Sequence, residues 1–241
     1  MWSDEVHRTD MPRLLSEISK SGFDGVEIGY HRLERFEQPE TFLNIVQKED
    51  LHVSGLHTLG KFYFNDDIAY LERAADFAQA VETQYVMVSG EQGDKNTDDL
   101  KAIADVLNKA GEICSQVGLT YCYHNHWWEL QNDQNELRTL CQLTDPALVS
   151  LCLDIGWVER SGTSVVQVVG EFIDRIRYFH LKDTRDQRFV DLGEGTVDFP
   201  AWLKAIGDPT KFYLTHERDE VLPDALESAT RSCTYLRSLG L

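Results

Sequence analysis

Four side chains that can bind a metal ion stand at the ends of short apolar runs that resemble β-strands. Asp154 and His180 each end such a run, and His124 and Glu217 come directly after two others. If these strands are parallel and close into a barrel, their carboxyl ends meet at one mouth, which is where (β/α)8 enzymes carry out their chemistry. The sequence therefore predicts a cluster of two imidazoles and two carboxylates at that mouth.

Such a cluster indicates a bound divalent cation and chemistry next to a carbonyl group. A divalent ion held by imidazole and carboxylate can polarise a carbonyl or hydroxyl group and stabilise an enediolate. These ligands suit Mn, Co, Fe or Zn better than Ca, and we take one Mn ion as the first choice. Any one of the four could be an ordinary polar group at a strand end. Four together are harder to explain, because ionised side chains tolerate burial only when they are paired or ligated.

The elements that must position these ligands alternate between apolar strand-like runs and amphipathic helical patterns. Their spacing is that of repeated βα units. The candidate strands centre near seven positions: Val26, Val53, Val86, Tyr121, Leu151, Ile176 and Tyr213. The chain has 241 residues, close to the roughly 250 of one such barrel. We therefore predict an α/β protein with a single (β/α)8 TIM-barrel domain over residues 1–241.

The start of this barrel departs from the repeating pattern. A strand should precede the first helix, and only Met1–Arg8 is available for it. We therefore expect the first strand to be short or missing. A strand gap exposes unpaired backbone donors and acceptors, which invite a partner. This predicts a homo-oligomer, or a longer amino terminus in the natural gene product.

Three longer segments follow predicted strands on the side where the ligands lie. We expect them to be βα loops, which carry the active-site residues of a barrel. They are Thr58–Asn65, His126–Asn135 and Thr184–Asp198. The last contains Gly193 and Gly195, which we interpret as a turn before the next helix rather than as a phosphate cradle.

Composition argues against several other functions. Lys and Arg number 23 against 41 Asp and Glu, so the formal net charge is −18. The chain therefore lacks the positive field that a general nucleic-acid binder needs, and it is not expected to bind anionic membranes. The five cysteines include no CxxC pair, which is typical of a reduced, cytoplasmic protein. The lack of an obvious Lys/Arg cluster favours a small substrate without a phosphate group.

Several short motifs are spread over nearly the whole chain. They are Gly25-Val26-Glu27, Ser54-Gly55-Leu56-His57, Tyr123-His124-Asn125-His126, Leu153-Asp154-Ile155-Gly156-Trp157, His180-Leu181-Lys182-Asp183, Gly193-Glu194-Gly195 and His216-Glu217-Arg218-Asp219. Together they resemble the xylose isomerase-like TIM barrels, a group that contains sugar-phosphate isomerases and epimerases, inosose dehydratase and endonuclease IV. The resemblance implies that the metal ligands are His124, Asp154, His180 and Glu217.

One departure from the family pattern bears on the reaction. Family epimerases usually have a glutamate where this chain has His124, and in them two carboxylates exchange the substrate proton. Only Glu217 of that pair is retained here, so epimerisation of that type would need another base. The candidates are Lys182, His126 and Glu129.

Lys182 is the preferred candidate for the missing base. It lies two residues past His180, so its side chain leaves the same strand on the same side. A lysine desolvated near a metal can have a lowered pKa and act as a base, although a salt bridge with a nearby acid is the alternative. We therefore predict Glu217 and Lys182 as the catalytic residues.

Four other residues are predicted to contact the substrate. His57 ends a strand and could hydrogen-bond a hydroxyl group, and His126 is either a substrate contact or a loop histidine. Trp157 could present an aromatic face to the C–H groups of a sugar or pack against the loops. Glu27 ends another strand, where a buried structural acid is equally expected.

These observations favour a metal-dependent sugar isomerase or epimerase. It would remove a proton next to a carbonyl through a metal-stabilised enediolate. The alternative is an inosose dehydratase-like lyase acting on a keto-sugar or cyclitol, whose patterns around His124 and His180 are the more similar. A non-catalytic carbohydrate-binding barrel is a more distant alternative, and the negative charge opposes an endonuclease.

Overall fold

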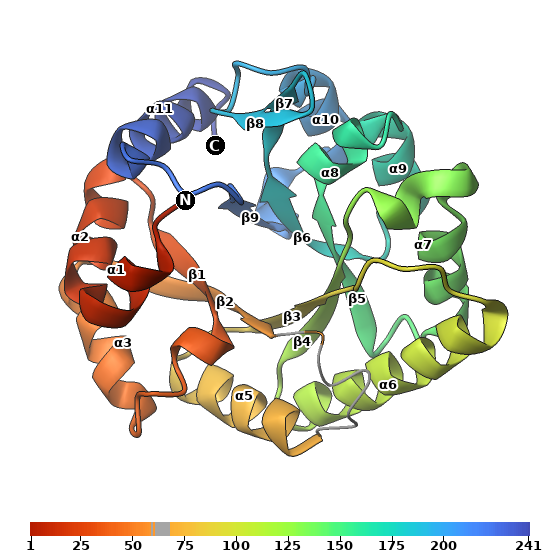
Figure 1. The fold of residues 1–241 in the computed structure, drawn as a ribbon, viewed down its shortest axis with the longest axis horizontal. Coiled ribbons are helices and arrows are strands. Elements are labelled where there is room, and N and C mark those ends of the chain that lie inside the picture. Colours follow the sequence, from red (N-terminus) through yellow and green to blue (C-terminus); the bar gives the residue numbers. More distant parts are fainter. Residues whose placement is uncertain (59, 61–67) are drawn as a thin grey trace.

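The computed structural model of the chain describes residues 1–58, 60 and 68–241. Most of the predicted loop Thr58–Asn65 therefore lies outside the described residues. Seven parallel strands form one sheet that curves into a nearly closed barrel (Figure 1). In sheet order they are β1 (Gly25–Gly29), β2 (His52–Thr58), β3 (Tyr85–Ser89), β4 (Thr120–His124), β5 (Val149–Asp154), β6 (Ile176–Leu181) and β9 (Tyr213–His216). Every predicted strand centre lies in one of them, which confirms the TIM-barrel fold.

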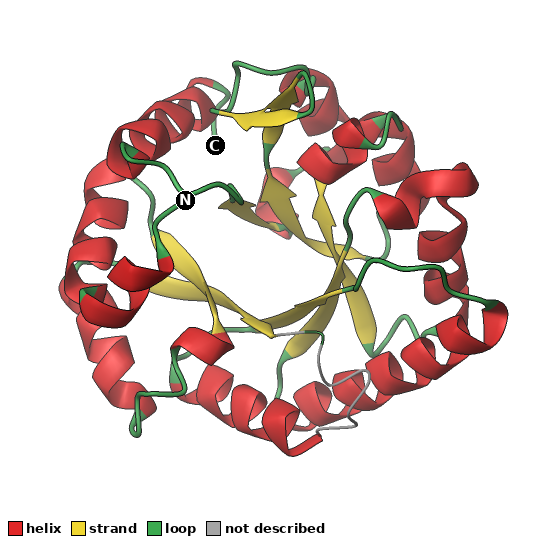
Figure 2. Ribbon diagram, in the orientation of Figure 1, coloured by secondary structure: helices red, strands yellow, loops and turns green. Residues whose placement is uncertain are grey.

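Helices surround the barrel on its outer side (Figure 2). Parallel strands need crossover connections, which are usually helical, and this explains the alternation along the chain. The helices are α1 (Asp4–Thr9), α2 (Met11–Ser21), α3 (Pro39–Lys48), α5 (Ile68–Ala80), α6 (Thr97–Gln116), α7 (Gln131–Leu143), α8 (Ile155–Arg160), α9 (Val165–Phe172), α10 (Phe199–Ile206) and α11 (Ala225–Ser238), with short 3-10 helices η1 (Tyr30–Arg32), η2 (Trp128–Leu130) and η3 (Pro209–Lys211). Among the helices described, none has the length and apolarity needed to span a membrane.

No strand precedes β1, because residues 1–24, all of them described, form only α1, α2 and irregular segments. The segment expected to supply a strand is instead partly helical. The Ser3 side chain accepts a hydrogen bond from the amide of Val6, and two acidic residues occupy the first turn of α1. Both features stabilise a helix amino terminus. The prediction that the first strand is short or missing is confirmed.

The resulting gap lies between β1 and β9, which are not paired with each other. The amino-terminal residue lies beside the end of β9. Its ammonium group donates to the carbonyl of Arg218 at 2.8 Å, and the amide of Leu222 donates to the carbonyl of Met1 at 3.0 Å. The homo-oligomer that we expected from this gap stays a prediction.

Two predicted loops contain regular structure. His126–Asn135 includes η2 and the start of α7, which passes through three residues with positive φ before becoming a regular helix. Thr184–Asp198 begins with an antiparallel hairpin of β7 (Asp183–Arg185) and β8 (Arg188–Val190), drawn at the top of Figure 1. Each strand of this hairpin has only three residues, which is too short to give an apolar pattern, so the sequence analysis did not predict it.

The barrel interior changes in character along the strands. Met87, Cys122, Cys152 and Tyr178 form a buried cluster inside the barrel. The last three each lie two residues before His124, Asp154 or His180 on the same strand, and therefore point to the same side. The buried cluster thus lies one layer deeper in the barrel than the candidate ligands, and the polar side chains begin at the carboxyl ends of the strands. All five cysteines are free.

Candidate metal centre

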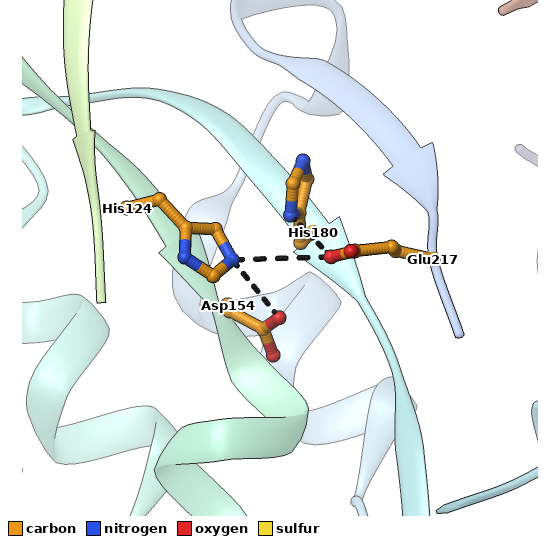
Figure 3. Close-up of side chains that lie close together, drawn as sticks. All are labelled: His124, Asp154, His180 and Glu217. Atoms are coloured by element: carbon orange, nitrogen blue, oxygen red, sulfur yellow. Dashed lines mark hydrogen bonds and ion pairs between the residues drawn. The ribbon is translucent and has the colours of Figure 1, made fainter. Parts of the chain in front are cut away.

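The four predicted ligands converge at the carboxyl ends of β4, β5, β6 and β9 (Figure 3). Each residue offers one ligand atom, and these atoms all lie within 4.8 Å of one another: His124, Asp154, His180 and Glu217. The first three side chains are almost fully buried, whereas that of Glu217 is 33% exposed. Side chains from four separate strand ends thus form one cluster of nitrogen and oxygen atoms.

The contacts within this cluster fit a shared cation better than a closed hydrogen-bond network. The Oε2 atom of Glu217 lies 2.7 Å from Nδ1 of His180 and 3.9 Å from Nε2 of His124. Yet Nδ1 of His180 and Oε2 of Glu217 are buried and make no well-aligned hydrogen bond with any described residue. Both atoms have close polar neighbours, since Oε2 of Glu217 also lies 3.0 Å from Nζ of Lys182. A set of two imidazoles and two carboxylates that converge in this way suits a divalent ion.

Asp154 is fixed in place by its local backbone. It ends β5, and its Oδ1 caps α8 by accepting a hydrogen bond from the amide of Trp157 at 2.9 Å. The Asn125 side chain accepts from the amide of Asp154, also at 2.9 Å. These contacts leave Oδ2 of Asp154 facing Nε2 of His124 at 3.2 Å.

Glu27 supports the cluster from β1. Its Oε2 contacts Nε2 of His180 at 2.7 Å, and its Oε1 contacts Nδ1 of His57 at 3.3 Å. Burial would raise the pKa of Glu27, but the neighbouring His180 and His57 rings hold this pKa well below its usual range. A carboxylate on one imidazole nitrogen leaves the other free for a metal. These contacts give Glu27 a structural role, and its predicted contact with a substrate stays a prediction, because it also lines the cavity described below.

Ser89 is a site residue that the sequence analysis did not identify. It ends β3, and its hydroxyl lies 2.8 Å from Nε2 of His57 and 3.2 Å from Nδ1 of His124. Ser89 therefore orients the His124 ring through Nδ1, because Nε2 of that ring faces Asp154. Its position at a strand end was the available signal, but serine is too common there to be singled out.

Lys182 lies among three carboxylates. Its Nζ is 3.0 Å from Oδ2 of Asp154, 3.0 Å from Oε2 of Glu217 and 2.9 Å from Oδ2 of Asp219. Burial lowers the pKa of Lys182, but these three acids raise it well above its usual value. These ion pairs match the salt-bridge alternative, whereas a lowered pKa beside a bound metal ion and the role of Lys182 as a base stay predictions. The motif containing Asp219 was noted in the sequence, but its contact with Lys182 was not foreseen.

The remaining candidates lie on the β4 and β5 side of the cluster. The His126 ring stacks on Trp128, with 4.2 Å between centroids, and lies 5.5 Å from the Trp157 ring. Glu129 is buried and accepts hydrogen bonds from the hydroxyl of Tyr123 and the amide of His126. These contacts give Glu129 a structural role, whereas substrate contacts by His126 and Trp157 stay predictions.

A cavity of about 680 Å³ opens on the other side, along β1 and β9. Glu27, His57, Glu217 and Asp219 are among its lining residues. Both ring nitrogens of His57 already contact protein atoms, Glu27 and Ser89. Its predicted contact with a substrate hydroxyl would therefore require one of these bonds to be exchanged.

Comparison with known proteins agrees with this geometry. A sequence model described as xylose isomerase-like TIM barrel matches residues 15–239. Over 92% of its length the chain is 26% identical to inosose dehydratase from Clostridium perfringens strain ATCC 13124, of which 88% is covered.

Solved structures show the same fold. A sugar phosphate isomerase/epimerase from Parabacteroides distasonis ATCC 8503 has a TM-score of 0.78 at 22% identity, covering 97% of this chain and 90% of that one. The probable 3-DHS dehydratase of petrobactin synthesis from Bacillus anthracis also has a TM-score of 0.78, at 15% identity and with 98% and 97% coverage.

Proposed function

The chain belongs to the xylose isomerase-like TIM-barrel family, and from this we propose that it is a metal-dependent enzyme acting on a small sugar or cyclitol. It would remove a proton next to a carbonyl group. The observation that carries the proposal is the convergence of the ligand atoms of His124, Asp154, His180 and Glu217 within 4.8 Å. The relative named inosose dehydratase supports this substrate class.

The residues of the cluster can divide the work of proton removal. A divalent ion bound there would polarise the substrate carbonyl and stabilise the negative charge that develops beside it. We assign Glu217 as the base, because it is partly exposed and lines the cavity. Its contacts with His180 and Lys182 involve Oε2, which leaves Oε1 to accept the proton. A base must lie within hydrogen-bond reach of that proton.

Lys182 is assigned the opposite role to the one first expected. Its ammonium group lies within 3.0 Å of Asp154, Glu217 and Asp219, at the edge of the cluster, and from there it would donate a proton to a hydroxyl group that leaves from the carbon beta to the carbonyl. Proton removal by Glu217 and proton donation by Lys182 together expel one water molecule. This favours a dehydratase-type reaction. Isomerisation is the second candidate, because a single carboxylate can return the proton to the neighbouring carbon without a leaving group.

Deuterium exchange tests the proposed reaction directly. The protein, loaded with Mn²⁺, is incubated in D2O with a panel of keto-sugars and inososes, and the products are analysed by NMR and mass spectrometry. We expect metal-dependent exchange at the carbon next to the carbonyl of at least one compound. Loss of water identifies a dehydratase, and a shifted carbonyl identifies an isomerase. Binding without exchange for every compound would contradict the proposal and support the carbohydrate-binding barrel.

Lys182→Met should lower turnover at least about a hundredfold, as expected for loss of a positioned acid. If the lysine donates the departing proton, exchange should persist in this variant while water loss stops. Metal content is measured in parallel, because the substitution also removes a cation from Asp154 and Glu217. Lys95→Met is the matched control, since Lys95 pairs with Glu136 at 2.9 Å and is only 10% exposed. Near-normal turnover would exclude Lys182 from the mechanism.

A further inference from the structure

We propose that this chain carries an oxyanion subsite centred on Arg32, beside His7 and His31, which binds a phosphate or carboxylate group of the substrate. The subsite lies in the same cavity as the base Glu217. The identity of the bound molecule as a substrate rests on the proposed function. The existence of the subsite does not, and can be tested separately.

One cavity connects the two places. Its lining includes Glu27 and Glu217 on the side of the cluster, and His7, His31 and Arg32 from α1 and η1. Because η1 directly follows β1, His31 and Arg32 lie at the carboxyl end of that strand, on the same side of the barrel as the cluster. At about 680 Å³, the cavity falls within the usual range of small-molecule sites, about 300–1,000 Å³. Both groups of residues therefore line the same cavity.

Arg32 has donor capacity that the protein does not use fully. Its Nε atom is covered by protein and has no hydrogen-bond partner among the described residues, while the side chain as a whole is 30% exposed. Its Nη2 donates to Asp4 at 2.5 Å, but the Asp4 side chain is 76% exposed. Exposed ion pairs contribute little stability, so a ligand oxyanion can displace Asp4. The planar guanidinium fork matches the geometry of phosphate and carboxylate.

The backbone beside Arg32 is shaped to admit an imidazole. A Cβ atom at Gly29 would lie 2.5 Å from Cε1 of His31, so only glycine lets this ring lie against the end of β1. On the α1 side, Nδ1 of His7 bonds the carbonyl of Ser3 at 2.8 Å, which fixes the ring. The His7 ring thus forms one fixed wall of the cavity, and His31 lines it beside Arg32.

The charges in the cavity would also orient an anionic substrate. Glu27, Glu217 and Asp219 line the cluster side, and they repel an anionic group from it. Arg32 attracts that group to its own side, which directs the carbonyl toward the cluster. The sequence favoured a substrate without phosphate because no Lys/Arg cluster was visible in it. Folding assembles this subsite from residues separated along the chain.

Phosphate binding to the Mn²⁺-loaded protein, measured by isothermal titration calorimetry, tests the subsite. Arg32→Gln should weaken inorganic phosphate binding at least about tenfold, because a charge-assisted hydrogen bond is lost. Asp4→Asn should strengthen it about two- to fivefold, because the competing carboxylate is removed. Arg35→Gln is the matched control: Arg35 donates to the carbonyl of His7 but does not line the cavity. It should change binding less than about twofold.

Equal weakening by Arg32→Gln and Arg35→Gln would overturn the subsite, as would equal binding to all four proteins, which would locate the phosphate elsewhere. Thermal melting of each variant, and Arg32→Lys as a charge-retaining variant, separate misfolding from loss of binding. Competition by a hexose 6-phosphate, a hexuronate and a neutral hexose then identifies the source of the oxyanion. Displacement by the neutral hexose as strong as by both charged sugars would contradict the proposal.

Different experimental results would contradict the subsite and the proposed function. Phosphate binding requires no turnover. If the effect of Arg32→Gln is absent while deuterium exchange occurs, only the subsite is wrong. If that effect is present and no sugar is exchanged, only the proposed function is wrong.

Discussion

Glu217→Gln should leave the protein folded and abolish deuterium exchange into substrate. The amide has almost the same shape as the carboxylate but cannot accept the substrate proton, and loss of a general base typically costs about a hundred- to ten-thousandfold. The substitution also weakens a metal ligand and removes a charge that Lys182 and His180 contact at 3.0 and 2.7 Å. Exchange is therefore measured at saturating Mn²⁺, with bound metal determined in the same sample.

Glu220→Gln is the matched control for this variant. Glu220 lies three residues further along, is 45% exposed and pairs with Arg218 rather than with the cluster. It should exchange deuterium at the wild-type rate. Wild-type exchange by metal-loaded Glu217→Gln would exclude Glu217 as the base and transfer the role to another group that lines the cavity.

Asp154→Ala should lose the bound metal almost completely. Asp154 is fully buried with its Oδ2 3.2 Å from Nε2 of His124, so alanine removes an oxygen ligand from the centre of the cluster. His180→Ala should behave in the same way, because it removes a ligand nitrogen and leaves His57 as the only imidazole of the described residues hydrogen-bonded to Glu27. Both variants are dialysed against Mn²⁺ and analysed for metal by elemental analysis. Full occupancy in both would exclude the proposed site.

The stability of Asp154→Ala needs its own control, because Asp154 also caps α8. Loss of such a cap costs about 1 kcal/mol. Asp198→Ala removes an equivalent cap from α10, whose acceptor bond to Ala201 is 2.9 Å long, and it lies outside the cluster. It should lose a similar amount of stability and keep the metal. Asp154→Asn should keep the cap acceptor and still bind metal weakly.

The positions of the strands and the convergence of the four candidate ligands could be predicted from the sequence alone. Strands buried on both faces appear as continuous apolar runs, and the residue that ends each run is visible in the chain. Parallel strands in a barrel bring all their carboxyl ends to one side. For this reason His124, Asp154, His180 and Glu217 could be grouped although they are far apart in sequence. The lack of a strand before the first helix could be predicted too, because Met1–Arg8 has little strand pattern.

The contacts around these ligands were decided only by the tertiary structure. Glu27 meets His180, and Ser89 meets His124, across the barrel or between neighbouring strands. Such contacts depend on register and on side-chain direction, which apolar periodicity does not specify. The hairpin of β7 and β8 was missed for a related reason, because its strands are too short to produce a pattern.

Lys182 shows most clearly where the sequence stops being sufficient. It comes directly after the last residue of β6, beside the cluster, but the direction of its pKa shift among these neighbours could not be predicted. That direction depends on the balance between burial, which disfavours the charged form, and nearby opposite charges, which favour it. Asp154, Glu217 and Asp219 come from different parts of the chain, and only folding places all three within 3.0 Å of its ammonium group. The sequence by itself determined which side chains reach the mouth of the barrel, and the tertiary structure decided which of them are charged neighbours.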